Sequence, residues 1–300
     1  MPELPEVETV ARDLARSVTG ATVRSVTWTW DRSIRHPTPP ARFALELRDA
    51  TIARVGRRAK SVLLHLADGR VVTVALRMTG ALLVEPPGTP SDPYVRVALQ
   101  LTDGRELRFR DVRKFGRIGL WAGGGLRRRR GSAARGSRAV AEARSPYRVG
   151  DVFAAHGPEP LAASFSAARL AERLRSRRGR LKSLLLDQTF IAGVGNIYAD
   201  EALWRARLHP LRRADTLQDD EIRRLHRSLR AVLRQGVRNR GSSISDYVDV
   251  DGALGGNQER LSVYRRTGEP CLRCGTPIQR IVVGQRSTHL CPRCQGPDGG

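Results

Sequence analysis

The sequence predicts an α+β protein, because three kinds of pattern follow one another along its 300 residues. Between residues 22 and 101, apolar and polar side chains alternate in short runs, which is typical of antiparallel strands. Between residues 166 and 235, apolar side chains recur at helical spacing instead. All four cysteines lie in the last thirty residues. We therefore expect a β-rich half, a helical segment and a cysteine-rich tail, in this order.

The chain start predicts a helix. After Met1, the segment Pro2-Glu3-Leu4-Pro5-Glu6-Val7-Glu8 offers a proline for a first helical position and glutamates for the positive end of the helix dipole. The apolar residues that follow at helical spacing should form one buried face. They are Val7, Val10, Leu14 and Val18.

Alternating segments in the first half are expected to be strands, and turn signals such as Ala67-Asp68-Gly69 separate them. Together they predict an antiparallel sandwich or barrel that carries one helix. The segments are residues 22–30, 43–47, 61–66, 71–75 and 95–101.

From residue 123 to about residue 150 the pattern gives way to glycine, serine and arginine. This composition favours a solvated, disordered loop, and an additional nonspecific grip on DNA is the alternative. Helices are expected beyond it, at residues 166–174, 181–186, 197–206 and 221–235. The predicted organisation is therefore residues 1–122, the insert 123–150, a helical domain 151–262 and a tail 263–300.

Positive charge is the dominant global property of the chain. Its 53 lysines and arginines exceed its 30 acidic residues, which gives a formal net charge of +23. Such an excess attracts a polyanion, and neutralised phosphates release counterions, so binding should depend strongly on salt. A ribosomal, histone-like or repair protein would fit equally well. Only Lys60, Lys114 and Lys182 are lysines, so each is a candidate for a role that needs an amine able to lose its proton.

The chain shows no sign of a membrane segment or of a secreted disulfide framework. No apolar run reaches the roughly 20 residues that a membrane span needs, and the first residues lack the pattern of a signal peptide. Clustered cysteines fit a metal site in a cytoplasmic protein better than disulfides. We expect a cytoplasmic protein without a membrane partner.

The cysteine spacing predicts one structural zinc ion. Cys271 and Cys274 form one pair, and Cys291 and Cys294 form a second pair after sixteen intervening residues. Four thiolates complete a tetrahedral zinc site and leave no open position for water. A redox-active arrangement or chance proximity are the alternatives. A hairpin between the pairs would present Arg286 as a phosphate contact, although one more surface arginine is an equally simple interpretation.

The segment Gly193-Val194-Gly195-Asn196-Ile197-Tyr198 lies between two predicted helices. Glycines let a backbone approach a phosphate closely, and the start of a helix presents free N–H groups. A tight turn between helices is the alternative. Arg178 and Lys182, in an arginine-rich stretch upstream, favour phosphate binding.

Four motifs in this order resemble the bacterial formamidopyrimidine-DNA glycosylase family, which is related to endonuclease VIII. They are the N-terminal heptapeptide from Pro2, Asp111-Val112-Arg113-Lys114-Phe115-Gly116, the Gly193 to Tyr198 turn and the four cysteines. The resemblance implies an N-terminal catalytic β-sandwich domain flanked by helices, a helix–two-turn–helix domain and a C-terminal antiparallel β zinc finger. It also implies that DNA binds in the cleft between them.

The resemblance implies that the nucleophile is Pro2, whose amine becomes free when Met1 is removed. An α-amino group has a pKa of about 7.7–8.0 against about 10.4 for lysine, so more of it is neutral near pH 7. Its attack on the sugar C1′ expels the damaged base and leaves an iminium ion that promotes successive eliminations. Glu3 would be the general acid, and Glu6 would support it.

Other residues are assigned by the same resemblance. Lys60 would contact the phosphate near the lesion and assist base loss and β-elimination, and Arg286 would serve the second, δ-elimination. The damaged nucleotide must be flipped out of the duplex, and a loop at residues 242–258 would close over it. The void would be filled by Met78, Arg113 and Phe115, two of which would otherwise be core residues. The residues expected to hold phosphates are Arg178, Lys182, Asn196 and Arg286.

The chain departs from the family pattern at several positions. The family usually has histidine where this chain has Ala75, so an imidazole near the active site is missing. Tyr94 and Arg96 stand where DNA-contacting histidines are common, and Val112 replaces a frequent proline. The nucleophile, the acid and the zinc ligands are retained. The departures therefore affect the expected lesion preference and rate, with Tyr94 kept as a DNA contact.

The sequence thus predicts a base-excision-repair DNA glycosylase and abasic-site lyase for 8-oxoguanine and formamidopyrimidines. The expected partner is double-stranded DNA with oxidised bases or abasic sites, bound by a monomer associated with the bacterial nucleoid. An endonuclease VIII-like enzyme for oxidised pyrimidines is one alternative, but Leu4 and the Arg113–Phe115 motif argue against it. A noncatalytic DNA-binding protein is the other.

Overall fold

The computed structural model describes residues 1–123 and 148–296. Most of the arginine-rich insert, residues 124–147, lies outside the described residues, so the disorder expected there stays a prediction. The chain divides into two compact units. The first contains Met1–Val10, Arg57–Lys60 and His156–Gly300, and the second contains Ala11–Gly56 and Ser61–Ala155. The chain start and Lys60 therefore belong to the unit that also holds the helical and cysteine-rich parts.

Two sheets form the β-rich second unit. The first sheet has the strand order β1-β7-β8-β6, and all its neighbours are antiparallel. The second has the order β2-β9-β5-β4-β3, in which β2 runs parallel to β9. The strands are β1 (Val23–Trp28), β2 (Ile34–His36), β3 (Ile52–Arg58), β4 (Ser61–Leu66), β5 (Val71–Ala75), β6 (Gly80–Glu85), β7 (Val95–Leu101), β8 (Glu106–Asp111) and β9 (Arg117–Trp121).

The burial of the strands follows the alternation of the sequence. β4 alternates buried and half-buried residues, as expected for a strand with one face in the core. β5 lies between β4 and β9, and its first four residues are all buried, so both of its faces are covered. The one polar residue among them, Thr73, accepts a hydrogen bond from the Trp121 indole at 2.8 Å. A buried hydroxyl is thereby satisfied.

One expected strand is a helix. Residues 43–47 belong to α2 (Pro40–Leu47), which begins at a proline and buries Phe43 and Leu47 completely. Residues four apart lie on one face of a helix, and a proline is favoured in the first helical turn, so both features outweigh the short alternation. The prediction of a strand here was wrong.

Two further helices are associated with this part of the chain. α1 (Leu4–Val18) begins one residue before Pro5, and its face of Val7, Val10, Leu14 and Val18 is buried as expected. α3 (Val149–Val152) is short and begins within the last residues of the predicted insert, so the expected loop ends earlier than residue 150. No helix in the described ranges is long and apolar enough to cross a membrane.

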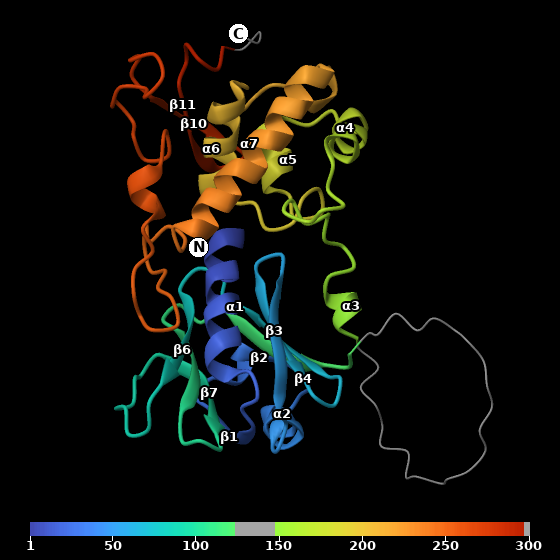
Figure 1. The fold of residues 1–300 in the computed structure, drawn as a ribbon, viewed down its shortest axis with the longest axis vertical. Coiled ribbons are helices and arrows are strands. Elements are labelled where there is room, and N and C mark those ends of the chain that lie inside the picture. Colours follow the sequence, from blue (N-terminus) through green and yellow to red (C-terminus); the bar gives the residue numbers. More distant parts are fainter. Residues whose placement is uncertain (124–147, 297–300) are drawn as a thin grey trace, which may run out of the picture. The chain divides into compact units, whose positions relative to one another are not determined.

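The first unit is built around α6 (Asn196–Ala206), which is buried on almost every side. α7 (Asp219–Arg238) packs along it through Ile222, Leu225, Leu229 and Leu233, and Figure 1 shows the two helices crossing. The hairpin β10 (Gln279–Val283) and β11 (Arg286–Leu290) packs against α6 through β11. The remaining elements of this unit are α4 (Ala167–Arg175), α5 (Leu181–Leu186) and the 3-10 turns Ala214–Thr216 and Asn257–Arg260, and a further 3-10 turn, Asp31–Ser33, lies in the second unit. The predicted α+β architecture of sandwich, helical domain and small β tail is confirmed.

Candidate active site

The start of the chain is anchored at the start of α6. Pro2 and Glu3 are both buried. The Glu3 carboxylate accepts the main-chain N–H of Ile197 at 2.9 Å and that of Tyr198 at 3.4 Å. These are free donors of the first helical turn, where a negative charge is favourable. The residue next to the predicted nucleophile therefore caps a helix almost two hundred positions away in the chain.

The two glycines of the Gly-x-Gly turn make room for this anchor. A Cβ at Gly195 would overlap the Glu3 carboxyl carbon, and one at Gly193 would lie 2.9 Å from Leu4. Gly193 also accepts the Leu4 N–H through its carbonyl at 2.9 Å. The glycines therefore bring the chain start close to α6, a reason for their presence that the sequence alone did not reveal.

Burial shifts the acidity of Glu3 to the neutral range. Its pKa is raised to about 7, because loss of hydration disfavours the carboxylate, and Glu6 adds repulsion. The positive charge of Lys60 and the two N–H groups of α6 act in the opposite direction. At pH 7 a substantial fraction of Glu3 is therefore protonated and able to act as an acid.

Glu6 links the chain start to the base of the loop at 242–258. Its carboxylate accepts the Glu3 N–H at 2.8 Å, the Tyr198 hydroxyl at 2.7 Å and the Ser242 N–H at 2.8 Å. Burial raises the pKa of Glu6 as well, and these three donors oppose the shift. Glu6 thus connects α1, α6 and the loop through one buried group.

Lys60 follows a tight turn whose geometry is set by partly buried ion pairs. Glu159 accepts the Arg57 guanidinium at 2.7 Å and the Ala59 N–H at 2.6 Å, and Arg57 also bonds Glu8 at 2.9 Å. Ala59 has a left-handed φ of 52°. The turn brings the half-buried Lys60 close enough to influence the Glu3 carboxyl. Pro2, Glu3 and Lys60 are therefore gathered in one unit.

The residues expected to hold phosphates differ in exposure. Arg178 and Arg286 are exposed, and Asn196 is half-buried at the first position of α6. Lys182 is fully buried, and its ammonium group pairs with the carboxylate of Asp200. Burial lowers the pKa of Lys182, and the carboxylate of Asp200 opposes this shift. The charge of Glu3 also raises the pKa, and the charge of Arg286 lowers it.

The predicted void-filling residues are exposed at the surface of the second unit. Met78 is 39% exposed and Phe115 is 48% exposed, so neither is a core residue. Arg113 is also exposed, and its guanidinium lies 5.0 Å from the centre of the Phe115 ring. Two large apolar side chains without a core role are suited to contact a binding partner.

Asp111 holds the two loops that carry these residues, a role that was not predicted from the sequence. It is completely buried, accepts the Thr79 hydroxyl at 2.5 Å and the Gly116 N–H at 2.7 Å, and Thr79 in turn accepts the Arg113 N–H at 3.1 Å. The signal for Asp111 was its place at the head of the Arg113–Phe115 motif.

Tyr94 and Arg96, two of the three positions where the resemblance led us to expect histidine, have different surroundings. Tyr94 is 40% exposed, and the guanidinium groups of Arg96 and Arg110 lie 5.8 and 5.1 Å from its ring centre. Arg96 is buried and donates to the main-chain carbonyl of Asp111 at 2.8 Å. Arg96 therefore supports the loop, while Tyr94 remains accessible.

Sequence reasoning also missed two polar residues of the first unit. Asp200 and its neighbour Glu201 are two acidic residues in a helical run that is mostly apolar, and that was the only signal for Asp200. Tyr264 lies beside Asn196. Burial raises the pKa of the Tyr264 phenol, and the hydrogen bond with Asn196 acts in the opposite direction. Its ring packs edge-on against His289 at 5.0 Å.

The four cysteines are gathered in one place. Their sulfur atoms all lie within 4.8 Å of one another, and Cys271 and Cys291 are buried. Cys271 accepts hydrogen bonds from the Trp204 indole at 3.4 Å and from the Arg273 N–H at 3.5 Å, which suits a thiolate ligand. The four donors fit one tetrahedral, structural zinc ion.

Family models match most of the chain. The model for the formamidopyrimidine-DNA glycosylase N-terminal domain matches residues 1–118, and that for the H2TH domain matches residues 156–248. A zinc finger found in FPG and IleRS matches residues 268–296, which include all four cysteines. The expected single structural zinc ion is thereby confirmed.

Relatives match over almost the full length. The formamidopyrimidine-DNA glycosylase of Chloroflexus aggregans is 47% identical over 98% of both chains, and that of Geobacillus kaustophilus is 43% identical over 98% of this chain and 100% of the relative. The MutM (Fpg) protein of Thermus thermophilus superposes with a TM-score of 0.81 and 41% identity over 98% of this chain and 99% of that one. The Lactococcus lactis Fpg bound to abasic-site DNA superposes with a TM-score of 0.83 and 32% identity, with the same coverage.

Proposed function

The chain belongs to the formamidopyrimidine-DNA glycosylase family, and from that membership we propose that Pro2 and Glu3 carry out its chemistry. Its activity is that of a DNA glycosylase with abasic-site lyase function, and oxidised purines are the substrates. Structures of relatives hold DNA that contains carbocyclic 8-oxo-G or FAPY-dG. The predicted family, fold class and activity are therefore confirmed.

One observation carries the assignment of residues. Glu3 is buried beside Pro2, is bonded to the start of α6, has a pKa of about 7 and lies within the influence of Lys60. An acid of this strength is matched to proton transfer near neutral pH. Pro2 supplies a secondary amine next to that acid once Met1 is removed.

The proposed first step replaces the base by the enzyme. The Pro2 nitrogen donates its electron pair to C1′, the bond from C1′ to the base breaks, and the base leaves with the proton that the attacking amine loses. The nitrogen then shares its electron pair with C1′ again, the bond from C1′ to the ring oxygen breaks, and Glu3 gives its proton to that oxygen. The product is an iminium ion between C1′ and Pro2, which serves as an electron sink.

Two eliminations follow in the proposed sequence. Loss of a proton from C2′ breaks the bond from C3′ to oxygen, and Lys60 assists by holding the phosphate near the lesion. Loss of a proton from C4′ then breaks the bond from C5′ to oxygen, and we assign Arg286 to the phosphate that leaves in this step. Hydrolysis of the iminium ion finally releases the sugar fragment and regenerates Pro2.

We further propose the groups that hold DNA. Exposed Met78 and Phe115 stack into the void left by the flipped nucleotide, and Arg113 bonds the orphaned base. The loop at residues 242–258 closes over the lesion. Phosphates and backbone are contacted by Arg178, Asn196, Arg286 and Tyr94. The Lys182 predicted for this role is fully buried, and it supports the phosphate-binding strand through the Ser287 carbonyl.

We propose that the protein acts as a monomer in the bacterial cytoplasm, associated with the nucleoid. The net charge of +23 supports association with DNA in bulk. Light scattering coupled to gel filtration, alone and with one equivalent of duplex, tests the monomer. A mass of two chains on one short duplex would contradict it.

Borohydride trapping on abasic duplex tests the nucleophile. The wild-type protein should form a covalent adduct, Pro2→Gly should lose most of it and Pro5→Ala, a matched proline without a free amine, should retain it. Mass spectrometry should find Met1 removed. A wild-type protein that binds the duplex but forms no adduct would exclude the proposed chemistry.

The same preparation tests the substrate class. Duplexes with 8-oxoguanine opposite cytosine should be cut faster than duplexes with thymine glycol. The reverse order would favour the alternative specificity for oxidised pyrimidines.

A further inference from the structure

β11 is held by polar side chains of the helical part of the same unit. The carboxylate of Asp200 accepts the His289 N–H at 2.9 Å. The Ser287 carbonyl accepts hydrogen bonds from the Lys182 ammonium at 3.1 Å and from the Asn196 amide at 2.9 Å. Two peptide groups of β11 are therefore fixed, at positions one and three residues after Arg286.

Asp200 is the centre of this cluster. It is 1% exposed, Lys182 is fully buried, and one carboxylate oxygen pairs with Lys182 while the other faces His289. Removal of one member of a buried ion pair leaves an uncompensated charge. Asp200 therefore keeps the buried Lys182 charged, and it holds the Lys182 ammonium group in place beside β11.

The cluster lies next to the reacting groups without belonging to them. The charges of Glu3 and of Arg286 both reach Lys182. Asp200 has no hydrogen bond to Pro2 or Glu3 among the contacts of the described residues. Its contacts run instead to the strand that begins with Arg286.

We propose that Asp200 is a positioning residue for the second elimination, because it fixes β11 so that Arg286 faces the phosphate that leaves from C5′. The inference rests on the proposed role of Arg286. Asp200 holds β11 in two ways. It accepts the His289 N–H directly, and it holds Lys182, whose ammonium group donates to the Ser287 carbonyl. Loss of this hold misplaces Arg286 without altering Pro2, Glu3 or the zinc ligands.

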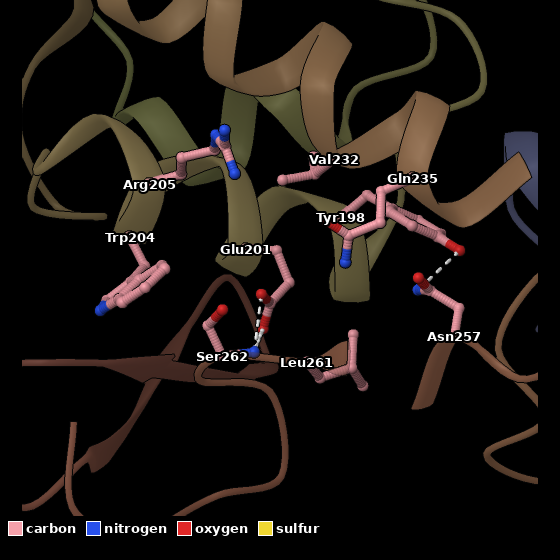
Figure 2. A pocket seen from close by; sticks show the side chains of 9 residues that line it. All are labelled: Tyr198, Glu201, Trp204, Arg205, Val232, Gln235, Asn257, Leu261 and Ser262. Carbon is pink, nitrogen blue, oxygen red and sulfur yellow. Dashed lines mark hydrogen bonds between the residues drawn. The ribbon is translucent and has the colours of Figure 1, made fainter. Parts of the chain in front are cut away.

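Glu201, the neighbour of Asp200, provides a matched control. It is 5% exposed and accepts the N–H groups of Ser262, Val263 and Tyr264 at 2.9–3.0 Å. Figure 2 shows its carboxylate turned toward the main chain of Ser262. Glu201 thus holds the segment that leads into the zinc finger, and no hydrogen bond joins it to Lys182 or β11 among the described contacts.

The test compares Asp200→Asn with Glu201→Gln on an abasic duplex labelled at its 5′ end. Denaturing gels separate the unsaturated-sugar ends left by the first elimination from the 3′-phosphate ends left by the second. Asp200→Asn should lower the ratio of second to first product by about tenfold, since even small displacements of a catalytic group can cost more than that. Glu201→Gln should keep the wild-type ratio, and both variants should keep one zinc ion per chain.

This ratio separates positioning from general damage, because a smaller fraction of folded enzyme lowers both products together. If Asp200→Asn does not fold, the double variant Lys182→Met with Asp200→Asn removes both charges and leaves no buried unpaired charge. It should then show the same low ratio. The proposal would be overturned if every folded Asp200 variant kept the wild-type ratio of second to first product. It would also be overturned if Glu201→Gln lowered this ratio as much as Asp200→Asn. The proposed function itself fails only if the wild-type protein forms no borohydride adduct.

Discussion

In the proposed mechanism, Glu3 serves two purposes that require opposite protonation states. As an acceptor of two N–H groups from α6 it is favoured as a carboxylate, and as the proposed acid for the opening sugar it must carry a proton. A pKa of about 7 populates both forms at neutral pH. The carboxylate form holds the side chain at the start of α6, and the protonated form is the one that would donate to the sugar.

The pH dependence of base excision follows from this residue. Above about pH 7, Glu3 loses its proton, so the single-turnover rate should fall as the pH rises. Below the pKa of an α-amino group, about 7.7–8.0, the Pro2 amine becomes protonated, and the rate should fall as the pH decreases. The profile should be a bell with its maximum between pH 7 and 8.

Glu3→Gln should be much slower and should lack the alkaline limb, because the group that titrates there is gone. The measurement is a series of single-turnover rates from pH 5.5 to pH 9 on an 8-oxoguanine duplex. A wild-type alkaline limb that persists in Glu3→Gln would assign it to another group.

Gly195→Ala tests the contact between the turn and Glu3. The new Cβ would overlap the Glu3 carboxyl carbon, so the acid must shift. Overpacking of this kind costs about 1–3 kcal/mol of stability, and displacement of a catalytic group by 1 Å can cost about 100-fold in rate. Urea unfolding and single-turnover excision measure the two effects.

Gly150→Ala is the matched control, because a Cβ at that position meets no atom within 4 Å. It should leave both the stability and the rate near their wild-type values. An equal loss in the two variants would show that the effect of Gly195→Ala does not arise from Glu3.

At the scale of elements, the order of strands, helices and cysteine pairs could be predicted because periodicity reports burial directly. β4, β5, β7 and α5 have the predicted bounds. The segment at residues 43–47 could not be assigned correctly, because five residues are too few to distinguish the spacing of apolar residues in a helix from that in a strand. Asp111 and Asp200 could not be assigned from sequence either, since a buried carboxylate is recognised by its partners, and those come from distant segments.

Asp111→Ala should loosen the two loops that present Met78 and Phe115. It removes the acceptor for the Thr79 hydroxyl and the Gly116 N–H, and unsatisfied buried donors cost about 1–3 kcal/mol each. We expect weaker extrusion of the lesion from duplex DNA, measured by the fluorescence of 2-aminopurine opposite an abasic site.

Borohydride trapping on a single-stranded abasic oligonucleotide should change little in Asp111→Ala, because no void has to be filled there. If Asp111→Ala lowers trapping by the same factor on single-stranded and double-stranded DNA, the loops do not act by filling the void in the duplex.

At the scale of the whole molecule, charge governs affinity. The excess of 23 positive charges predicts that binding weakens steeply with salt, for damaged and undamaged duplexes alike. Arg178 is exposed and has no acidic hydrogen-bond partner among the described contacts. Arg178→Ala should reduce the slope of log affinity against log salt by about 0.9 on both duplexes.

Arg175→Ala is the matched control from the same stretch, because Arg175 already pairs with Asp219. Its slope should stay close to that of the wild-type protein. Fluorescence anisotropy between 50 and 300 mM salt measures both variants, and identical slopes for the two would remove Arg178 from the phosphate contacts.

The helix cap that Glu3 forms on α6 has a consequence for biosynthesis. Glu3 stands next to the proposed nucleophile in the sequence, but the N–H groups of Ile197 and Tyr198 that hold its carboxylate are added nearly two hundred codons later. We therefore expect a chain that ends before residue 195 to lack a fixed Glu3, and with it the proposed strand-breaking activity.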